Sequence, residues 1–161
     1  MTPPPADGGT AAAAAGASAL LYLDASALVP LVVPDPHPRR ADAAVRGGGA
    51  TLLVSDFAAA EVASSVSRMI RTGRLSEGTA RAALADFDAW TARFANRVFA
   101  ERADIAAAGA FLRRLDTGLR TPDALNVAIA QRAGAALLTF DAGMAAGAHL
   151  LGVRLAPVPP P

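Results

Sequence analysis

Residues 20–29 read Leu20-Leu21-Tyr22-Leu23-Asp24-Ala25-Ser26-Ala27-Leu28-Val29, an apolar run that ends abruptly in a carboxylate. A run this short, with no alternation of apolar and polar residues, is typical of a parallel strand that helices cover on both faces. Ligands of open α/β sheets bind just beyond the carboxyl ends of the strands. The stretch therefore predicts the first core strand of an α/β domain, with Asp24 at its carboxyl end as a candidate site residue.

The composition is that of one globular domain. The chain has 161 residues, of which 53% are hydrophobic and 18% charged, and this length is enough for one sizeable core. It has no Cys, which excludes disulfide scaffolds and thiolate metal sites and favours a reducing cytoplasm. All 15 basic residues are Arg, and the net charge is +1. This charge is too small to indicate nucleic-acid binding, so local Arg clusters would have to supply any phosphate contacts.

The two ends of the chain differ in composition from the middle. Residues 1–18 are rich in Pro, Gly and Ala and lack a pattern of large apolar residues, so we expect a disordered leader. It does not fit a signal peptide, because its apolar part is mostly Ala and no Arg precedes it. The folded domain is expected over 19–156, followed by a Pro-rich tail over 157–161. No apolar stretch is long enough to predict a membrane span.

Strands and helices are expected to alternate along the domain. After the first strand, the spacing of apolar residues and of Gly and Pro predicts helices over 26–33, 39–46, 55–73, 76–94, 103–115, 121–134 and 142–150. Strands are predicted over 51–54, 97–100, 135–140 and 152–155. This order predicts a central parallel sheet in a three-layer α/β/α sandwich.

Four acidic residues fall where this topology brings the chain to one edge of the sheet. They are Asp24 and Asp141 directly after strands, Glu61 near the start of a helix, and Asp123 in the first turn of another. Each also has a structural explanation, because the aspartates suit helix N-termini and the glutamate suits a solvated helix face. Their convergence favours a shared site, and the first strand should then lie centrally in the sheet.

Carboxylates gathered in this way repel one another unless a cation joins them. All-oxygen ligands and the absence of Cys favour Mg²⁺, or Mn²⁺, over Zn²⁺. His37 and His149 lack ligand spacing to the acids and are expected to be structural or solvent-facing. Such a cluster suits phosphodiester hydrolysis. A phosphoaspartate phosphatase is disfavoured, because Asp24 is not followed by a second Asp and the chain has no Lys.

The sequence resembles PIN-domain ribonucleases of the VapC toxin type over about residues 20–155. The resemblance rests on Tyr22-Leu23-Asp24-Ala25-Ser26-Ala27-Leu28-Val29, on Ser55 with Ala60-Glu61-Val62, on Thr121-Pro122-Asp123-Ala124-Leu125 with Ala128, and on Leu138-Thr139-Phe140-Asp141. Each motif alone is weak, but the four occur in the family's order and at similar spacing.

The resemblance implies a function and a set of roles. The acidic metal-binding quartet would be Asp24, Glu61, Asp123 and Asp141, with the Ser26 and Thr139 hydroxyls as supports. It also implies Mg²⁺-dependent endonucleolytic cleavage of RNA, a homodimer, and inhibition by a small cognate antitoxin that inserts into the active-site groove. The sequence departs from many relatives in having Pro30-Leu31-Val32-Val33-Pro34 where a basic residue is common, which bears on RNA affinity and target choice.

Four further residues have more than one interpretation. Asn126 lies one helical turn beyond Asp123 and either faces the site or is a solvent-facing amide. Arg68, Arg71 and Arg74 recur at three-residue spacing and either follow an RNA backbone or form a solvated face or an antitoxin contact.

An alternative function comes from a different class of protein. The chain could be a catalytically weak PIN-like module that acts through RNA or protein contacts. The presence of all four acids disfavours this alternative.

Overall fold

The computed structural model describes residues 19–33, 38–46 and 49–158. The expectations for the leader over 1–18 and for His37 lie outside these residues, as does most of the tail. No helix in the described parts of the chain is both long and apolar enough to cross a membrane.

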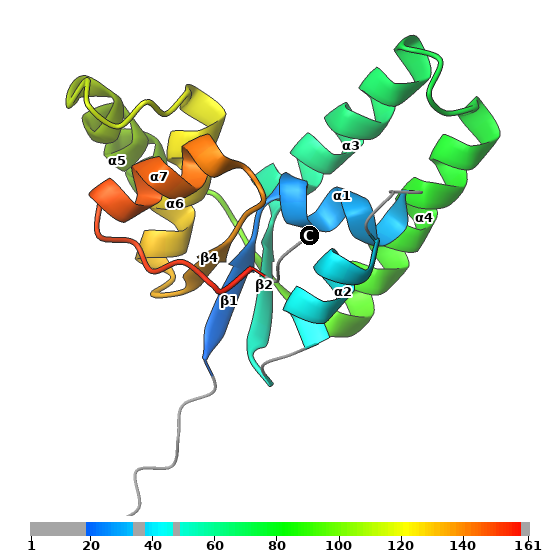
Figure 1. The fold of residues 1–161 in the computed structure, drawn as a ribbon, viewed down its shortest axis with the longest axis horizontal. Coiled ribbons are helices and arrows are strands. Elements are labelled where there is room, and N and C mark those ends of the chain that lie inside the picture. The colour runs from blue at the N-terminus through cyan, green and yellow to red at the C-terminus, as the bar shows by residue number, and fades with distance from the viewer. Residues whose placement is uncertain (1–18, 34–37, 47–48, 159–161) are drawn as a thin grey trace, which may run out of the picture.

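A sheet of four parallel strands forms the centre of the fold (Figure 1). The strands are β1 (Leu20–Leu23), β2 (Thr51–Ser55), β3 (Ala95–Val98) and β4 (Ala136–Leu138), in the order β3-β2-β1-β4. Strand β1 thus lies between β2 and β4, which confirms its predicted central position. The parallel pairing places the carboxyl ends of β1, β2 and β4 at one edge of the sheet.

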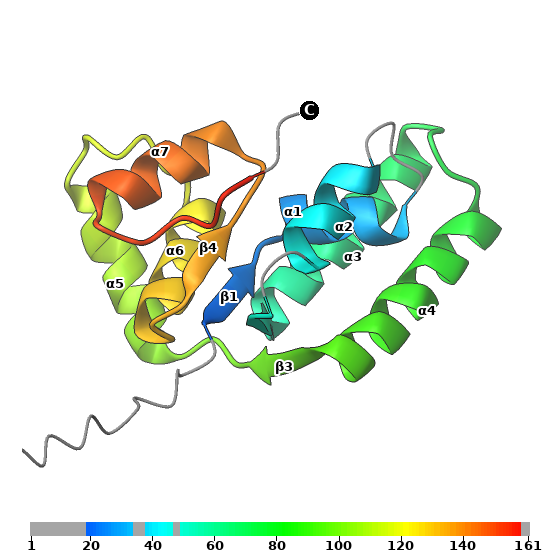
Figure 2. The same ribbon diagram turned by 60° about the horizontal axis from the view of Figure 1, so that its bottom comes forward.

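Helices cover both faces of the sheet, as predicted for a three-layer sandwich (Figures 1 and 2). One face carries α1 (Ala25–Val32), α2 (Pro38–Arg46), α3 (Asp56–Arg71) and α4 (Glu77–Phe94), and the other carries α5 (Arg102–Arg113), α6 (Thr121–Arg132) and α7 (Ala142–Leu150). Successive β1 residues alternate between the two hydrophobic cores: Leu21 and Leu23 face the first group of helices and Tyr22 faces the second.

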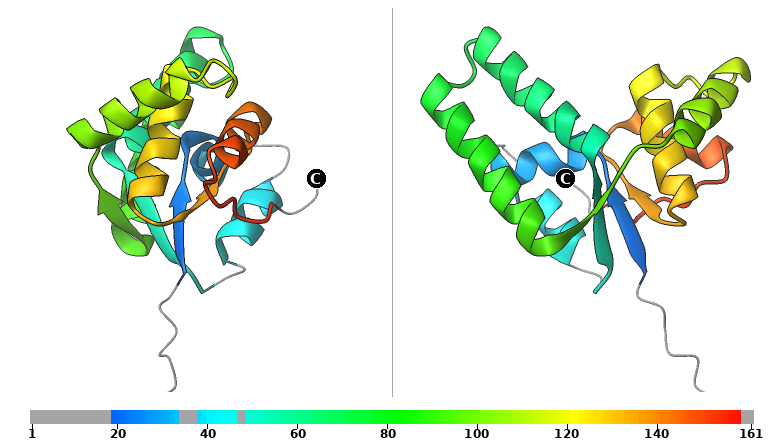
Figure 3. Two further views of the ribbon diagram at one scale, coloured as in Figure 1. Left: turned by 90° about the vertical axis from the view of Figure 1, so that its left-hand side faces the viewer. Right: turned by 180° about the vertical axis from the view of Figure 1, so that it is seen from behind.

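The α3–α4 hairpin extends beyond the carboxyl ends of the strands (Figure 3). The Ser55 hydroxyl caps α3 by accepting a hydrogen bond from the Ala58 amide at 2.9 Å. Val62 and Val66 face the core from this helix. Gly73, with a φ of 70°, makes the turn that follows, a conformation that glycine adopts at little cost.

The strand ends differ from the sequence prediction because each strand stops where its partner stops. Strand β3 covers 95–98 instead of 97–100, since β2 ends at Ser55, opposite Val98. Strand β4 stops at Leu138, since β1 ends at Leu23 opposite it. The predicted strand over 152–155 is wrong: it is reduced to one isolated parallel bridge between Leu137 and Leu155.

An ion pair between the buried Asp104 carboxylate and the partly exposed Arg132 guanidinium joins α5 to α6. The Asp104 side chain is 1% exposed and receives two bonds from the Arg132 guanidinium, from Nε to Oδ1 at 2.7 Å and from Nη2 to Oδ2 at 3.0 Å. Arg132 also donates to the Phe99 carbonyl at 2.8 Å and pairs with Glu101 at 2.8 Å. Oδ2 of Asp104 in turn accepts from the Glu101 amide at 2.8 Å, so this ion pair also closes the N-terminus of α5.

Candidate active site

Asp24 is a buried carboxylate at the carboxyl end of the central strand, with 3% of its surface exposed. Its Oδ1 accepts hydrogen bonds from the Ser26 hydroxyl at 2.8 Å and from the Ala27 amide at 3.2 Å. Its Oδ2 accepts from the Thr139 hydroxyl at 3.1 Å. Asp24 therefore caps α1, as its structural explanation proposed, and it also lies where the site was expected.

All of these Asp24 donors are electrically neutral. Burial raises the pKa of the Asp24 carboxyl above its ordinary value, and the hydrogen bonds from Ser26, Ala27 and Thr139 oppose that rise. Among the described residues, no Arg forms an ion pair with Asp24. The charge of this carboxylate is therefore stabilised by dipoles alone, and an added cation would stabilise it further.

The segment after β4 places Asp141 beside this pair of hydroxyls. The Phe140 amide donates to the Ser26 hydroxyl at 2.8 Å, and the Asp141 amide donates to the Thr139 hydroxyl at 3.1 Å. The Asp141 carboxylate accepts from the Met144 amide at 2.8 Å, which caps α7. Thr139 thus links the backbone of Asp141 to the carboxylate of Asp24.

Glu61 meets Asn126 above the carboxyl edge of the sheet, although their helices cover opposite faces. Asn126 is completely buried, and its Nδ2 donates to Glu61 Oε2 at 2.7 Å and to the Pro122 carbonyl at 3.2 Å. The solvent-facing alternative for Asn126 is therefore wrong. Glu61 is half-buried and not on a fully solvated helix face.

Tyr22 and Ser55 extend this contact into the core, and sequence reasoning assigned neither of them a role in the site. The Tyr22 hydroxyl donates to Asn126 Oδ1 at 2.7 Å and lies 2.7 Å from the Ser55 hydroxyl. Burial strongly raises the pKa of Tyr22, and the charge of Glu61 adds to the rise. The sequence signal for Tyr22 was its position two residues before Asp24, because side chains two positions apart on a strand lie on the same face.

The acids influence one another electrostatically. Burial is the largest cause of a raised pKa at Glu61, the negative charges of Asp24 and Asp123 raise it further, and the Asn126 hydrogen bond opposes these effects. The Asp123 side chain is 11% exposed, and its Oδ2 accepts from the Arg120 backbone amide at 2.9 Å and from Arg120 Nε at 3.4 Å. Arg120 is thus the residue that precedes the first turn of α6.

A cavity of about 320 Å³ opens beside two of these acids and carries two cationic side chains. Its lining residues are Ala25, Glu61, Ser64, Ser65, Arg68, Arg120, Pro122 and Asp123. Of the three arginines with more than one interpretation, Arg68 lines this cavity. Arg71 instead donates to the Ser67 hydroxyl at 2.8 Å, and Arg74 lies beyond the end of α3. Sequence reasoning did not identify Arg120 as a site residue.

The four acids are not grouped as a ready-made ligand set. Within residues 19–33, 38–46 and 49–158, no three Asp, Glu or His side chains are arranged so that they could hold a metal ion. His149 is exposed, as expected. The chemistry of the donors nevertheless suits a hard divalent cation, because the available ligands are carboxylate and hydroxyl oxygens and burial raises the pKa of both Asp24 and Glu61.

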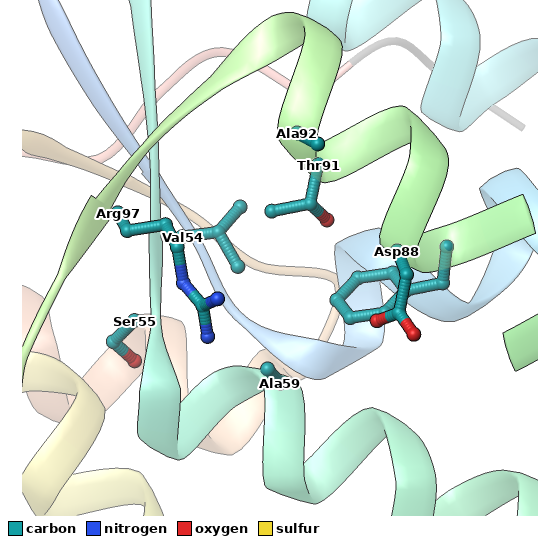
Figure 4. Close-up of a pocket in the computed structure, with 8 residues that line it drawn as sticks. Val54, Ser55, Ala59, Asp88, Thr91, Ala92 and Arg97 are labelled. Atoms are coloured by element: carbon teal, nitrogen blue, oxygen red, sulfur yellow. The ribbon is translucent and has the colours of Figure 1, made fainter. Parts of the chain in front are cut away.

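A second cavity, of about 270 Å³, lies between α4, α3 and the ends of β2 and β3 (Figure 4). The Arg97 side chain points toward it from β3, and those of Asp88 and Thr91 point toward it from α4. The Thr91 hydroxyl is buried and has no hydrogen-bond partner among the described residues. Ser55 lies at the wall of this cavity, so the polar contacts from Glu61 through Asn126 and Tyr22 end there.

Comparison with known proteins gives a family match and several similar structures. The family profile described as PIN domain matches residues 21–150. No curated protein sequence matches the chain.

The similar structures share the fold at low sequence identity. The crystal structure of VapC20 from Mycobacterium tuberculosis, described as a toxin that cleaves the sarcin-ricin loop, has a TM-score of 0.66 at 17% identity, covering 86% of this chain and 99% of that one. VapBC2 from Rickettsia felis, bound to a DNA fragment from its promoter, has a TM-score of 0.61 at 15% identity, covering 84% and 96%. FitAcB from Neisseria gonorrhoeae has a TM-score of 0.61 at 13% identity, covering 85% and 96%.

Proposed function

Because this chain belongs to the PIN-domain family, we propose that it is a divalent-metal-dependent endoribonuclease, the toxin of a toxin–antitoxin pair. The observation that carries the proposal is Asp24, a carboxylate buried at the end of the central strand and held by neutral donors. Glu61 is close enough for the charges of Asp24 and Asp123 to raise its pKa. Such an arrangement costs stability by itself, which is typical of functional sites.

The proposed roles follow from the positions of the side chains. The carboxylates that would hold the cation, directly or through water, are those of Asp24, Glu61, Asp123 and Asp141. One of these four would orient the attacking water. Bound Mg²⁺ or Mn²⁺ supplies positive charge that neutralises the phosphate and lowers the pKa of water. Ser26 and Thr139 would fix the orientation of Asp24, since each hydroxyl donates to one of its oxygens.

Arg68 and Arg120 would bind the RNA backbone next to the acids. Both line the cavity that contains Glu61 and Asp123, and the Arg120 side chain is 79% exposed. Guanidinium groups bind phosphate oxygens with two parallel hydrogen bonds and carry no base preference of their own. They would therefore position RNA without selecting its sequence. This local positive charge would attract the RNA backbone, since the net charge of the chain is only +1.

A small antitoxin and a second copy of the chain are the proposed protein partners. The similar VapBC2 and FitAcB structures support an antitoxin by analogy. Phe94, Phe99 and Ile105 expose more than half of their surfaces, at 53%, 63% and 64%, and exposed large apolar residues favour protein contacts. We place the protein in the cytoplasm, where RNA is available and a chain without Cys is suited to the reducing conditions.

A binding module with little turnover is the second candidate. The observation that favours it is that Asp24, Asp123 and Asp141 each accept a backbone hydrogen bond at a helix N-terminus. These bonds would retain the aspartates without any catalysis. Such a module would bind RNA with comparable affinity in the presence and absence of Mg²⁺ and leave it intact.

The purified protein should cleave structured RNA when Mg²⁺ or Mn²⁺ is present and should stop when EDTA is added. Glu61→Gln should lower the rate by at least ~10²-fold, because it removes one of the proposed ligands. The matched control is Glu77→Gln, at an exposed position on α4, which should cleave like the unmodified chain. A loss of cleavage in Glu61→Gln alone, with both variants purified in the same way, excludes a contaminating nuclease. Intact RNA in the presence of metal would favour the binding module, whereas equal activity of Glu61→Gln would reject Glu61 as a metal ligand.

The stability of the protein should depend jointly on Mg²⁺ and pH. The pKa values of Asp24 and Glu61 are raised in the folded state, so the metal-free fold binds protons more tightly than the unfolded chain and loses stability as pH rises above the ordinary carboxyl range. A cation competes with these protons. Thermal unfolding should therefore show a larger Mg²⁺-induced rise in Tm at about pH 8 than at about pH 5. A rise of equal size at both pH values contradicts metal binding at these carboxyls.

A further inference from the structure

A buried chain of polar side chains runs from the end of β2 to the Glu61 carboxylate. Ser55 and Tyr22 lie 2.7 Å apart through their hydroxyls, Tyr22 donates to Asn126 at 2.7 Å, and Asn126 donates to Glu61 at 2.7 Å. Ser55, Tyr22 and Asn126 are each no more than 1% exposed. These contacts connect β1, β2, α3 and α6, so the two faces of the sandwich meet along them.

The directions of these hydrogen bonds are fixed by the groups at the far end. Asn126 Nδ2 faces two acceptors, Glu61 Oε2 and the Pro122 carbonyl, so its amide cannot be turned around without losing both bonds. Oδ1 of Asn126 then faces the Tyr22 hydroxyl, whose single proton must be donated to it. The Ser55 hydroxyl must therefore donate to Tyr22, while its oxygen accepts from the Ala58 amide.

The hydrogen bonds from Ser55 through Tyr22 and Asn126 all donate toward Glu61. They restrict the orientation of the Glu61 side chain, which its own helix leaves free. A half-buried glutamate on a helix surface has several free rotatable bonds, and holding it in one orientation costs conformational entropy. The Asn126 amide provides the fixed donor, and Tyr22 fixes the amide. Hydrogen bonds in such chains also polarise one another, so the charge of Glu61 and the Tyr22 hydroxyl are coupled.

We propose that Tyr22 and Ser55 are positioning residues for Glu61, which they hold in its working orientation through the Asn126 amide. The inference rests on the proposed function for its kinetic effect, and it extends that function to residues that touch neither RNA nor cation. Tyr22→Phe keeps the ring and its packing but leaves Asn126 Oδ1 without its donor and Ser55 without its acceptor. Asn126 then keeps its two Nδ2 bonds but has a buried Oδ1 without a donor, so it holds Glu61 less firmly.

The kinetic test is a double-mutant cycle on the full chain with RNA as substrate. Tyr22→Phe should lower kcat by about tenfold, the usual scale for residues that support metal ligands, and leave the KM for RNA unchanged. In an Asn126→Ala background the same substitution should change kcat by less than about twofold, since the connection to Glu61 is already cut. An equal effect of Tyr22→Phe in both backgrounds, or no effect in either, overturns the proposal.

A second variant tests whether general destabilisation alone could explain a lower kcat. It lies in α3, the helix that carries Glu61. Val66→Ala removes core volume from α3, where Val66 is 1% exposed, and should lower the unfolding free energy without changing kcat at a temperature where the protein is folded. If Val66→Ala lowers kcat as much as Tyr22→Phe, loosening of α3 explains the result and the positioning role is rejected.

A spectroscopic test is independent of RNA cleavage. Tyr22 is the one tyrosine in the chain, so growth on 3-fluorotyrosine labels this site alone and keeps its hydroxyl. The ¹⁹F signal should shift on Glu61→Gln, and most of that shift should vanish when Asn126→Ala is also present. A shift of the same size without the Asn126 amide means that Tyr22 senses Glu61 through space, and the proposal fails. Absence of RNA cleavage by the unmodified protein would reject the proposed function while this measurement still decides the positioning role.

Discussion

Asp24→Asn is expected to abolish RNA cleavage while leaving the fold intact. The substitution keeps the size of the side chain and removes the charge that the proposed cation would neutralise. We expect the rate with Mg²⁺ to fall by at least ~10³-fold, which corresponds to about 4 kcal/mol of transition-state stabilisation. Initial rates on a labelled RNA, measured with saturating metal, give this value directly.

The stability of the Asp24→Asn variant should not fall, in contrast to its activity. Asp24 is a buried charge without an ion-pair partner among the described residues, so the neutral amide relieves a desolvation cost. Without metal, the variant should unfold at the same temperature as the unmodified chain or at a higher one. Asp86→Asn, at an exposed position of α4, is the matched control and should change neither activity nor stability. A lower unfolding temperature for Asp24→Asn without metal would contradict the claim that the buried charge of Asp24 costs stability.

Arg132→Met is expected to cause the largest loss of stability among single substitutions of residues whose side chains are at least partly exposed. It leaves the Asp104 carboxylate, 1% exposed, without its bidentate partner. Breaking one side of a buried ion pair typically costs about 3–5 kcal/mol, because the remaining charge is not compensated. Urea unfolding should show a lower midpoint with an unchanged m-value.

An exposed ion pair provides the comparison for this prediction. Arg46 and Asp42 form a contact at 2.6 Å, but their side chains are 79% and 51% exposed. Arg46→Met should therefore cost less than about 1 kcal/mol. Restoring neutrality with Asp104→Leu in the Arg132→Met background should recover part of the loss. It should not recover all of it, since the Asp104 bond to the Glu101 amide is also removed. Equal costs for the two Arg substitutions would contradict the assigned burial.

Hydrophobic spacing predicted the order of the elements except for the strand over 152–155, and the convergence of the four acids predicted the central position of β1. Strands covered on both faces are short apolar runs, and those at residues 20–23 and 51–55 are of this kind. Strand ends were predicted less well, because a strand ends where its neighbour stops donating and accepting hydrogen bonds. That limit is set by pairing across residues far apart in the sequence, as between Ser55 and Val98.

The contacts of the acids were less predictable than their positions. Asp24 was correctly expected after a strand, because that depends on local sequence. The Asn126 contact with Glu61 depends on two helices from opposite faces meeting over the sheet edge, which no spacing within one helix indicates. The same holds for Arg120, which precedes α6 and lines one cavity with Glu61 of α3, a helix from the other face of the sheet. That the four acids act as one metal-binding quartet stays a prediction.

The pairing of β1 with β4 has a consequence for synthesis of the protein. Leu23 pairs with Leu138, and Asp24 takes a hydrogen bond from Thr139, so the two halves of this site are separated by most of the chain. A nascent polypeptide on the ribosome has Asp24 early but lacks its partners until residues 136–141 have emerged. Pairings at such long sequence separation also form slowly. The proposed nuclease site therefore cannot assemble until residues 136–141 have been synthesised and have paired with β1.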